Sequence, residues 1–122
     1  MTRRGCIAAC LLVALTWNAC ALAQNCDKPG GVPEMTECAT LRLRAAEREM
    51  ANYYGILLDS EDKDFAKAVR EAQEAWMRWR EAEAKLVERT VNDPGLVLYT
   101  RRTQEAQMTE DRVKDLRSLA GN

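Results

Sequence analysis

The stretch KDFAKAVREAQEAWMRWREAEAKLVERT, residues 63–90, decides the fold class. It contains no proline or glycine, so no residue in it breaks a helix. Its apolar residues recur at steps of three, four and seven, which predicts one long helix with an apolar seam in heptad register. The seam residues are Phe65, Val69, Ala72, Trp76, Trp79 and Leu86, with a gap at Glu83. Because large aromatic rings stabilise cores, we expect Trp76 and Trp79 to pack inside the protein.

A further helix is predicted on each side of this stretch. Residues 34–58 carry apolar side chains at steps of three and four on one face. These are Ala39, Leu43, Ala46, Met50, Tyr53 and Leu57. Of the adjacent Tyr53 and Tyr54, we expect one to pack and the other to face solvent. Residues 96–119 have a thinner apolar pattern, and we expect this helix to cover the bundle from one side.

Two short polar segments separate the three helices. Residues 59–62 supply side chains that cap helix N-termini, and residues 92–95, Asn-Asp-Pro-Gly, form a strong turn signal. Short connections favour antiparallel neighbours, and no segment shows the alternation of a strand. The sequence therefore predicts an all-α domain over residues 24–122, an elongated up-down-up three-helix arrangement.

The N-terminal segment has the composition of a signal peptide. Residues 1–23 contain no acidic side chain, begin with two arginines and include an apolar run of about ten residues, too short to span a bilayer. Small residues at positions 21 and 23 place the cleavage before Gln24, so we expect an exported, periplasmic protein with no stable membrane span. A buried N-terminal helix is one alternative. Another is a lipoprotein acylated at Cys20, which is disfavoured because Trp17 and Asn18 stand where small or aliphatic residues are needed.

Two cysteines remain after the signal peptide, Cys26 and Cys38. In an exported chain such a pair most often forms a disulfide. Prolines and glycines in residues 29–33 exclude a helix between them, so the bridge is expected to tie an irregular N-terminal arm to the first turn of a helix. The alternative is a redox-active pair, but the eleven intervening residues are many more than the two of catalytic dithiols.

Composition excludes several kinds of chemistry. The 122 residues include 18 basic and 19 acidic side chains and no histidine. Without histidine there is no Ser–His or Cys–His nucleophile and no histidine-bearing zinc site. A net charge of −1, which becomes −3 when the two arginines of the signal peptide are removed, argues against nucleic-acid binding. We therefore expect no enzyme, no metal and no cofactor.

Three motifs in order resemble those of the LprI-like lysozyme inhibitor family, which consists of small exported helical domains. The first surrounds Cys38 and extends to Tyr54, the second extends from Ala72 to Ala82, and the third from Met108 to Leu116. The resemblance covers residues 26–119. The motif side chains expected to have structural roles are Trp76, Trp79, Arg80, Tyr54, Thr109 and Arg112. Arg80 lies one position off the predicted seam, where it can stack on an aromatic ring or pair with an acid such as Glu47.

This chain departs from the family pattern at several positions. The resemblance implies a second cysteine pair, but Ala84 and Gln104 occupy those positions, which leaves Cys26 and Cys38 as the sole candidate bridge. Ala51 stands where the family commonly has asparagine. The loop around Gly95 is also shorter than the family's glycine-rich loop.

The resemblance implies a binding protein of the bacterial cell envelope that inhibits lysozyme, or a similar wall-cleaving enzyme, by blocking its cleft. The candidate binding residues are Lys28, Gly30 and Gly31 in the arm and Asp93 and Gly95 in the second turn, and the sequence does not rank the two loops. The alternative is a structural or assembly helper of the envelope with no enzyme target, self-associating through unused seam positions. A small-ligand binder or enzyme is a third reading, and the oligomeric state is open.

Overall fold

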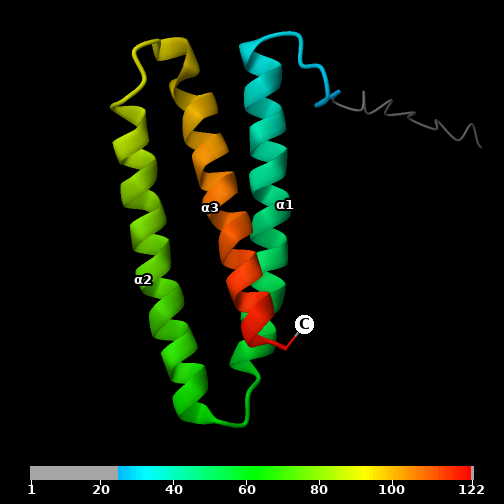
Figure 1. Ribbon diagram of the computed structural model, residues 1–122, viewed down its shortest axis with the longest axis vertical. Coiled ribbons are helices and arrows are strands. Elements are labelled where there is room, and N and C mark those ends of the chain that lie inside the picture. The colour runs from blue at the N-terminus through cyan, green and yellow to red at the C-terminus, as the bar shows by residue number, and fades with distance from the viewer. Residues whose placement is uncertain (1–24, 122) are drawn as a thin grey trace, which may run out of the picture.

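A computed structural model describes residues 25–121, and they form three helices and no strand. Helix α1 spans Val32–Leu58, α2 spans Lys63–Glu88 and α3 spans Val97–Leu119, with a short 3-10 helix, η1, at Pro94–Leu96 (Figure 1). The predicted signal peptide, the cleavage before Gln24 and Cys20 lie outside the described residues.

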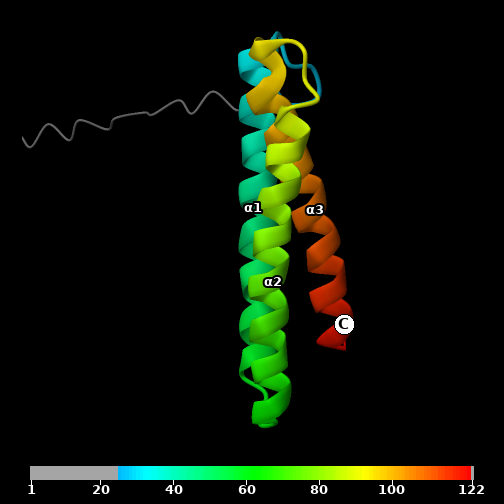
Figure 2. The ribbon, with the colours of Figure 1, turned by 90° about the vertical axis from the view of Figure 1, so that its left-hand side faces the viewer.

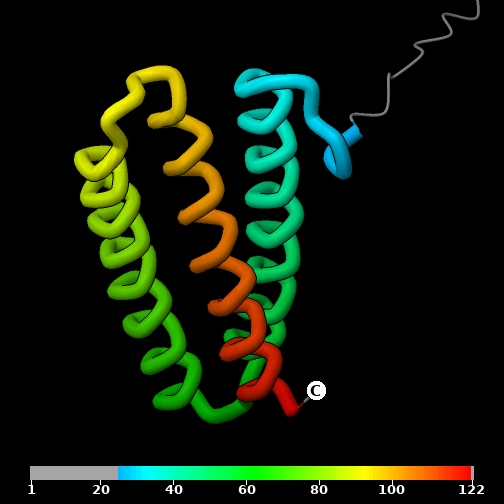
Figure 3. Tube along the Cα trace, turned by 45° about the horizontal axis from the view of Figure 1, so that its top comes forward, coloured from blue at the N-terminus to red at the C-terminus, as the bar shows by residue number. Residues whose placement is uncertain are grey.

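The helices run up, down and up, as predicted, and the bundle is elongated (Figures 1 and 2). With 23 to 27 residues each, they are about 35–40 Å long at 1.5 Å per residue. The N-terminal arm and the α2–α3 connection lie at one end, and the α1–α2 connection lies at the other (Figure 3). We call the first of these the arm end.

Local sequence explains where the helices begin. The Asp62 carboxylate accepts hydrogen bonds from the backbone amides of Asp64 and Phe65, both at 3.0 Å, and so caps α2. A proline in the first turn opens α1, with Gly31 as its N-cap, and the helix begins two residues earlier than the sequence predicts. The Asp93 carboxylate accepts from the Gly95 amide at 2.8 Å and orders the turn before α3.

The largest apolar cluster joins all three helices in the half of the bundle away from the arm end. Its buried members are Met50, Leu57, Val69, Val113 and Leu116. The predicted stripe on α1 is confirmed, because five of its six residues are buried and Tyr53 packs against this cluster. Tyr54 packs against it as well, so the expectation that one of the two tyrosines faces solvent is wrong.

Helix α3 does not merely cover the bundle from one side, as its thin apolar pattern suggested. It packs more closely on α1 and on α2 than those two helices pack on each other, and it lies between them in Figure 1. Its buried residues include two polar ones, Glu105 and Thr109, which are 5% and 0% exposed. Both side chains are hydrogen-bonded, so these polar residues can form part of the packing surface of α3. A prediction based on apolar residues alone does not detect such positions.

The predicted seam on α2 belongs to two different faces. Val69 is buried and Trp76 partly buried against the core, but Phe65, Trp79 and Leu86 are 36%, 53% and 58% exposed. The expectation that Trp79 packs in the core is therefore wrong. The side that α2 turns to the bundle contains Ala66, Val69, Gln73, Trp76, Arg80 and Ala84. Because Gln73 and Arg80 on this side are polar, the spacing of apolar residues did not identify it as the inward face.

The predicted disulfide between Cys26 and Cys38 is confirmed, with Cα atoms 5.5 Å apart. Residues 25–30 of the arm are all exposed. The bridge thus holds the arm against the second turn of α1. The expectations that it reaches the first turn and that no helix lies between the cysteines are wrong, because a proline is tolerated in the first turn and α1 already begins at Val32.

Candidate functional site

The motif residues at the centre of the bundle bind one another. The Arg80 guanidinium on α2 donates from Nη1 to Glu47 Oε1 on α1 at 3.0 Å and to Thr109 Oγ1 on α3 at 2.9 Å. The Thr109 hydroxyl in turn donates to the Glu105 carbonyl at 2.7 Å. One side chain from the second motif therefore ties all three helices together.

Trp76 provides the aromatic platform of this cluster. The guanidinium carbons of Arg80 and Arg112 lie 5.3 and 5.9 Å from the centroid of its ring, within cation–π range. Arg112 Nε donates to Gln73 Oε1 at 3.1 Å, and Gln73 Nε2 lies 3.3 Å from Met50 Sδ. We call Gln73, Trp76, Arg80, Thr109 and Arg112 the central cluster.

The side chains of the central cluster hold the helices together and do not themselves enclose a pocket. Among the described residues, every buried side-chain polar atom has a hydrogen-bond partner. Tyr54 lies outside the cluster and packs against the apolar core, and Trp79 lies outside it with half of its surface exposed. Of the motif aromatics, Trp79 has the surface to contact a partner.

A second charged network joins α2 and α3 nearer the arm end. Arg101 bonds Glu81 at 2.8 Å, Glu88 at 2.6 Å and Glu105 at 3.1 Å. The hydrogen bond from Arg101, followed by that from Lys85, lowers the pKa of Glu81. Sequence reasoning did not identify this network, because Glu88 and Glu81 are 13 and 20 residues from Arg101 and look like ordinary surface charges.

The Arg101 network lies where the resemblance implies a covalent link. Ala84 is one turn from both Glu81 and Glu88 along α2, and Gln104 is one turn from Arg101 along α3. These ion pairs therefore connect the turns of α2 and α3 at which the resemblance implies a second cysteine pair.

Replacing Arg101 with methionine is expected to lower the free energy of unfolding by about 1 kcal/mol at pH 7. A carboxylate whose pKa is lowered in the folded state stabilises it above the unfolded-state value and loses that contribution as the pH falls. The cost of the substitution should therefore shrink between pH 7 and pH 3, measured by urea unfolding. Lys67→Met is the control, because its pair with Glu71 is exposed and 3.9 Å long. An equal cost at both pH values would contradict the assignment.

The two candidate loops lie at the same end of the bundle (Figure 1). Lys28 and Gly30 are exposed on the arm, and the backbone amide of Gly30 donates to the Glu34 carboxylate. Asp93 and Gly95 are exposed in the α2–α3 turn. The candidate binding residues, apart from the partly buried Gly31, thus form an exposed rim around the arm end.

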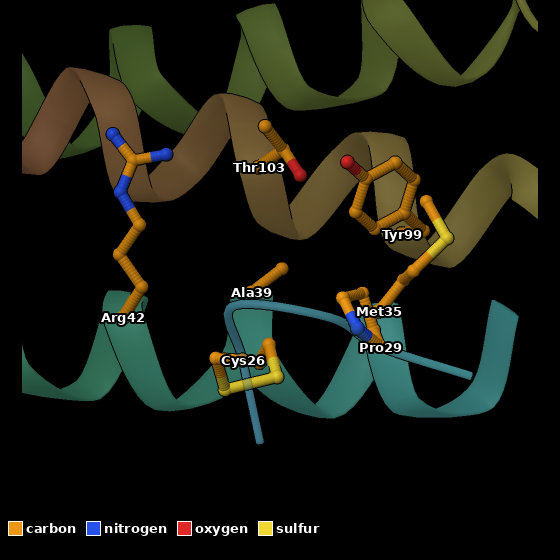
Figure 4. Close-up of a pocket in the computed structure, with 8 residues that line it drawn as sticks. Cys26, Pro29, Met35, Ala39, Arg42, Tyr99 and Thr103 are labelled. Atoms are coloured by element: carbon orange, nitrogen blue, oxygen red, sulfur yellow. A yellow bond between two sulfur atoms is a disulfide. The ribbon is translucent and has the colours of Figure 1, made fainter. Parts of the chain in front are cut away.

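A cleft of about 300 Å³ lies between the arm, α1 and α3. Its walls are Cys26, Pro29, Met35, Cys38, Ala39, Arg42, Tyr99 and Thr103. In Figure 4, the arm crosses in front of α1, Arg42 points toward α3 at one side, and Met35 and Tyr99 lie at the other. Sequence reasoning found the disulfide in this wall but not Tyr99 or Thr103, which reach the cleft only through the packing of α3 on α1.

Arg42 fixes the inner side of the cleft. It donates to the Glu110 carboxylate and, from Nη2, to Gln107 Oε1 at 2.8 Å, and it lowers the pKa of Glu110 through that hydrogen bond. With its carboxylate partner bound, the guanidinium stays charged and joins α1 to α3. Apart from Arg42 and the hydroxyl groups of Tyr99 and Thr103, the walls are apolar or sulfur-containing, which suits a side chain or loop of a partner better than a reacting substrate.

Residues 25–121 contain neither a cluster of side chains placed to bind a metal ion nor a helix that could span a membrane. No three His, Cys, Asp or Glu side chains in this range are placed to hold a metal ion. No helix within it is both long and apolar enough to cross a membrane.

Comparison with known proteins identifies the family. A family model described as "Lysozyme inhibitor LprI" matches residues 23–116, which include the disulfide, the central cluster and most of α3. No curated protein and no solved structure matches the chain. The chain belongs to the LprI lysozyme inhibitor family.

Proposed function

We propose that this protein is exported to the periplasm and inhibits lysozyme, or a similar wall-cleaving enzyme, by covering the enzyme's substrate cleft with its arm end. The family match over residues 23–116 carries this proposal. The net charge of −3 left after removal of the predicted signal peptide supports it modestly, because a weakly acidic protein is steered toward a cationic enzyme.

The arm end suits this role because it is exposed and yet ordered. The disulfide fixes the arm, and the Asp93 cap with the following 3-10 helix fixes the second loop. A preorganised surface loses little conformational entropy on binding, which favours affinity. The bundle behind it supplies rigidity, since its interior polar groups are already paired.

The experiment mixes purified residues 24–122, with the disulfide formed, with lysozyme and follows the lysis of bacterial cells. We expect lysis to slow in proportion to added protein and a stoichiometric complex to form on gel filtration. Unchanged lysis at large molar excess, together with no complex, would overturn the proposal.

A side chain added at Gly31 tests which surface binds. The backbone of Gly31 is extended, with φ 174°, and a Cβ there meets only Pro33 Cδ at an ordinary 3.8 Å. Gly31→Gln should therefore fold normally and weaken inhibition about tenfold or more by obstructing the contact. Potency is read from the lysis assay, and folding from circular dichroism.

Gly55→Gln is the matched control for Gly31→Gln. Gly55 lies near the far end of α1, and a Cβ there meets nothing within 4 Å. The same added side chain at that end should leave inhibition unchanged. If both variants inhibit like the wild type, the arm end is not the contact surface, although lysozyme inhibition itself would stand.

A further inference from the structure

An exposed side of α2, beside its inward face, carries a second apolar stripe with strict heptad spacing. Phe65, Trp79 and Leu86 are 36%, 53% and 58% exposed, and the four alanines that alternate with them in this stripe are exposed too. In order, the residues of this outer stripe are Phe65, Ala68, Ala72, Ala75, Trp79, Ala82 and Leu86.

The spacing of the outer stripe is that of a coiled-coil seam. Its residues alternate steps of three and four from position 65 to position 86 without a gap, which is the a/d pattern of a helix that packs along another helix. The bundle does not use this pattern, because α2 turns Val69 and Gln73 inward instead. An exposed face of this length and regularity is suited to a helical partner.

The charges beside the outer stripe specify what that partner is. Each a-type residue of the outer stripe (Phe65, Ala72, Trp79 and Leu86) is directly preceded by an exposed charged residue. In chain order these charged residues are Asp64, Glu71, Arg78 and Lys85, two acidic residues followed by two basic ones. When two copies of a helix pack in opposite directions, this flank meets the same flank of the other copy. Asp64 then faces Lys85 of the other copy, and Glu71 faces Arg78.

The opposite flank disfavours a parallel pair of the same helices. In a parallel pair these charges would face the e-type positions, Val69, Trp76 and Glu83, of the other copy. Val69 is buried and Trp76 partly buried within their own bundle, and neither offers a charge. A parallel pair would therefore form only the ion pair between Arg78 and Glu83, whereas in the antiparallel pair all four charges of the flank face an opposite charge.

We propose that this protein forms an antiparallel homodimer in which the outer stripes of two α2 helices pack together. In the register that these charges set, the two aromatic side chains of the stripe face alanines: Phe65 meets Ala82 of the second copy and Trp79 meets Ala68. Ala68 borders a recess of about 210 Å³ between α2 and α3, whose walls include Phe65 and Leu119. This recess receives the indole of Trp79 from the second copy.

The dimer leaves the proposed inhibitory surface free. The outer stripe does not include the arm or the α2–α3 turn, so an antiparallel pair carries one arm end at each extremity. Dimerisation is thus separate from inhibition, and the two can fail independently.

Charge reversal at Glu71 and Arg78 tests the interface, measured by sedimentation equilibrium of residues 24–122 across a wide range of concentrations. Glu71→Arg alone and Arg78→Glu alone should each weaken the dimer about tenfold or more, because like charges then face each other. The double variant, E71R/R78E, should restore it. Glu74→Arg is the matched control on the same helix, since Glu74 is exposed but lies away from the outer stripe and its flank.

Cross-linking tests the direction of packing. Asp64 and Lys85 are 21 residues apart on one helix, about 30 Å, so a zero-length carbodiimide can join them only between copies. We expect an Asp64–Lys85 peptide in the dimer and its loss in Lys85→Met. A wild type that is monomeric throughout would overturn the proposal. So would a dimer that ignores both single reversals, or one that lacks the cross-linked peptide.

Discussion

Replacing Trp76 with alanine is expected to lower the free energy of unfolding by about 3 kcal/mol. The indole fills the space between three helices and is the platform for the guanidinium groups of Arg80 and Arg112. Its removal leaves a cavity and takes the aromatic partner from two cations at once. Trp76→Phe should recover part of the loss, because a smaller ring still offers a face to the cations.

Trp79→Ala is the matched comparison, one turn further along the same helix. Half of the Trp79 side chain is exposed, so its removal should cost less than about 1 kcal/mol in the monomer. Both variants are to be unfolded in urea at low micromolar concentration, where self-association contributes little, and followed by circular dichroism. If Trp79→Ala costs as much as Trp76→Ala, the assignment of the two faces of α2 is wrong.

The first helix could be predicted from sequence because its burial is entirely apolar. Ala39, Leu43 and Met50 recur at helical spacing, and the other faces are mostly polar, with Leu41 and Ile56 as exposed exceptions. The pattern therefore maps directly onto burial. The same holds for the breaks, since Asp62 and Asp93 cap through contacts with their near neighbours, which sequence reasoning can see.

The orientation of α2 could not be predicted in the same way. Its inward face includes Gln73 and Arg80, and its outward face includes Phe65, Trp79 and Leu86. The prediction considered only the spacing of apolar residues, and it therefore assigned residues of both faces to a single seam. Arg80 faces inward because its hydrogen-bond partners, Glu47 and Thr109, lie on the other two helices. These partners are 33 and 29 residues away in the sequence, so the local pattern of α2 does not reveal them.

The candidate site was predictable in part for the same reason. The disulfide and the two loops follow from residue types that are local in the chain. The cleft between them depends on Tyr99 and Thr103, whose position is set by how α3 packs on α1. That packing relies on buried polar residues, Glu105 and Thr109, that no apolar periodicity marks.

Replacing both cysteines with serine, C26S/C38S, is expected to lower the free energy of unfolding by about 3 kcal/mol, the chain-entropy value for a loop of this size. Helix content should persist, because the apolar cluster around Leu116 lies in the other half of the bundle. The arm, which is exposed throughout residues 25–30, should lose its fixed position, and the cleft should lose one of its walls.

If the arm end contacts lysozyme, inhibition by C26S/C38S should fall at least tenfold at a temperature where circular dichroism shows the variant still folded. Mass spectrometry of the unmodified protein, with a two-dalton gain on reduction, confirms the bridge before the comparison. A variant that keeps wild-type stability would show that the bridge constrains little. A variant that is less stable but inhibits as well as the wild type would show that the disulfide stabilises the fold and is not needed for binding.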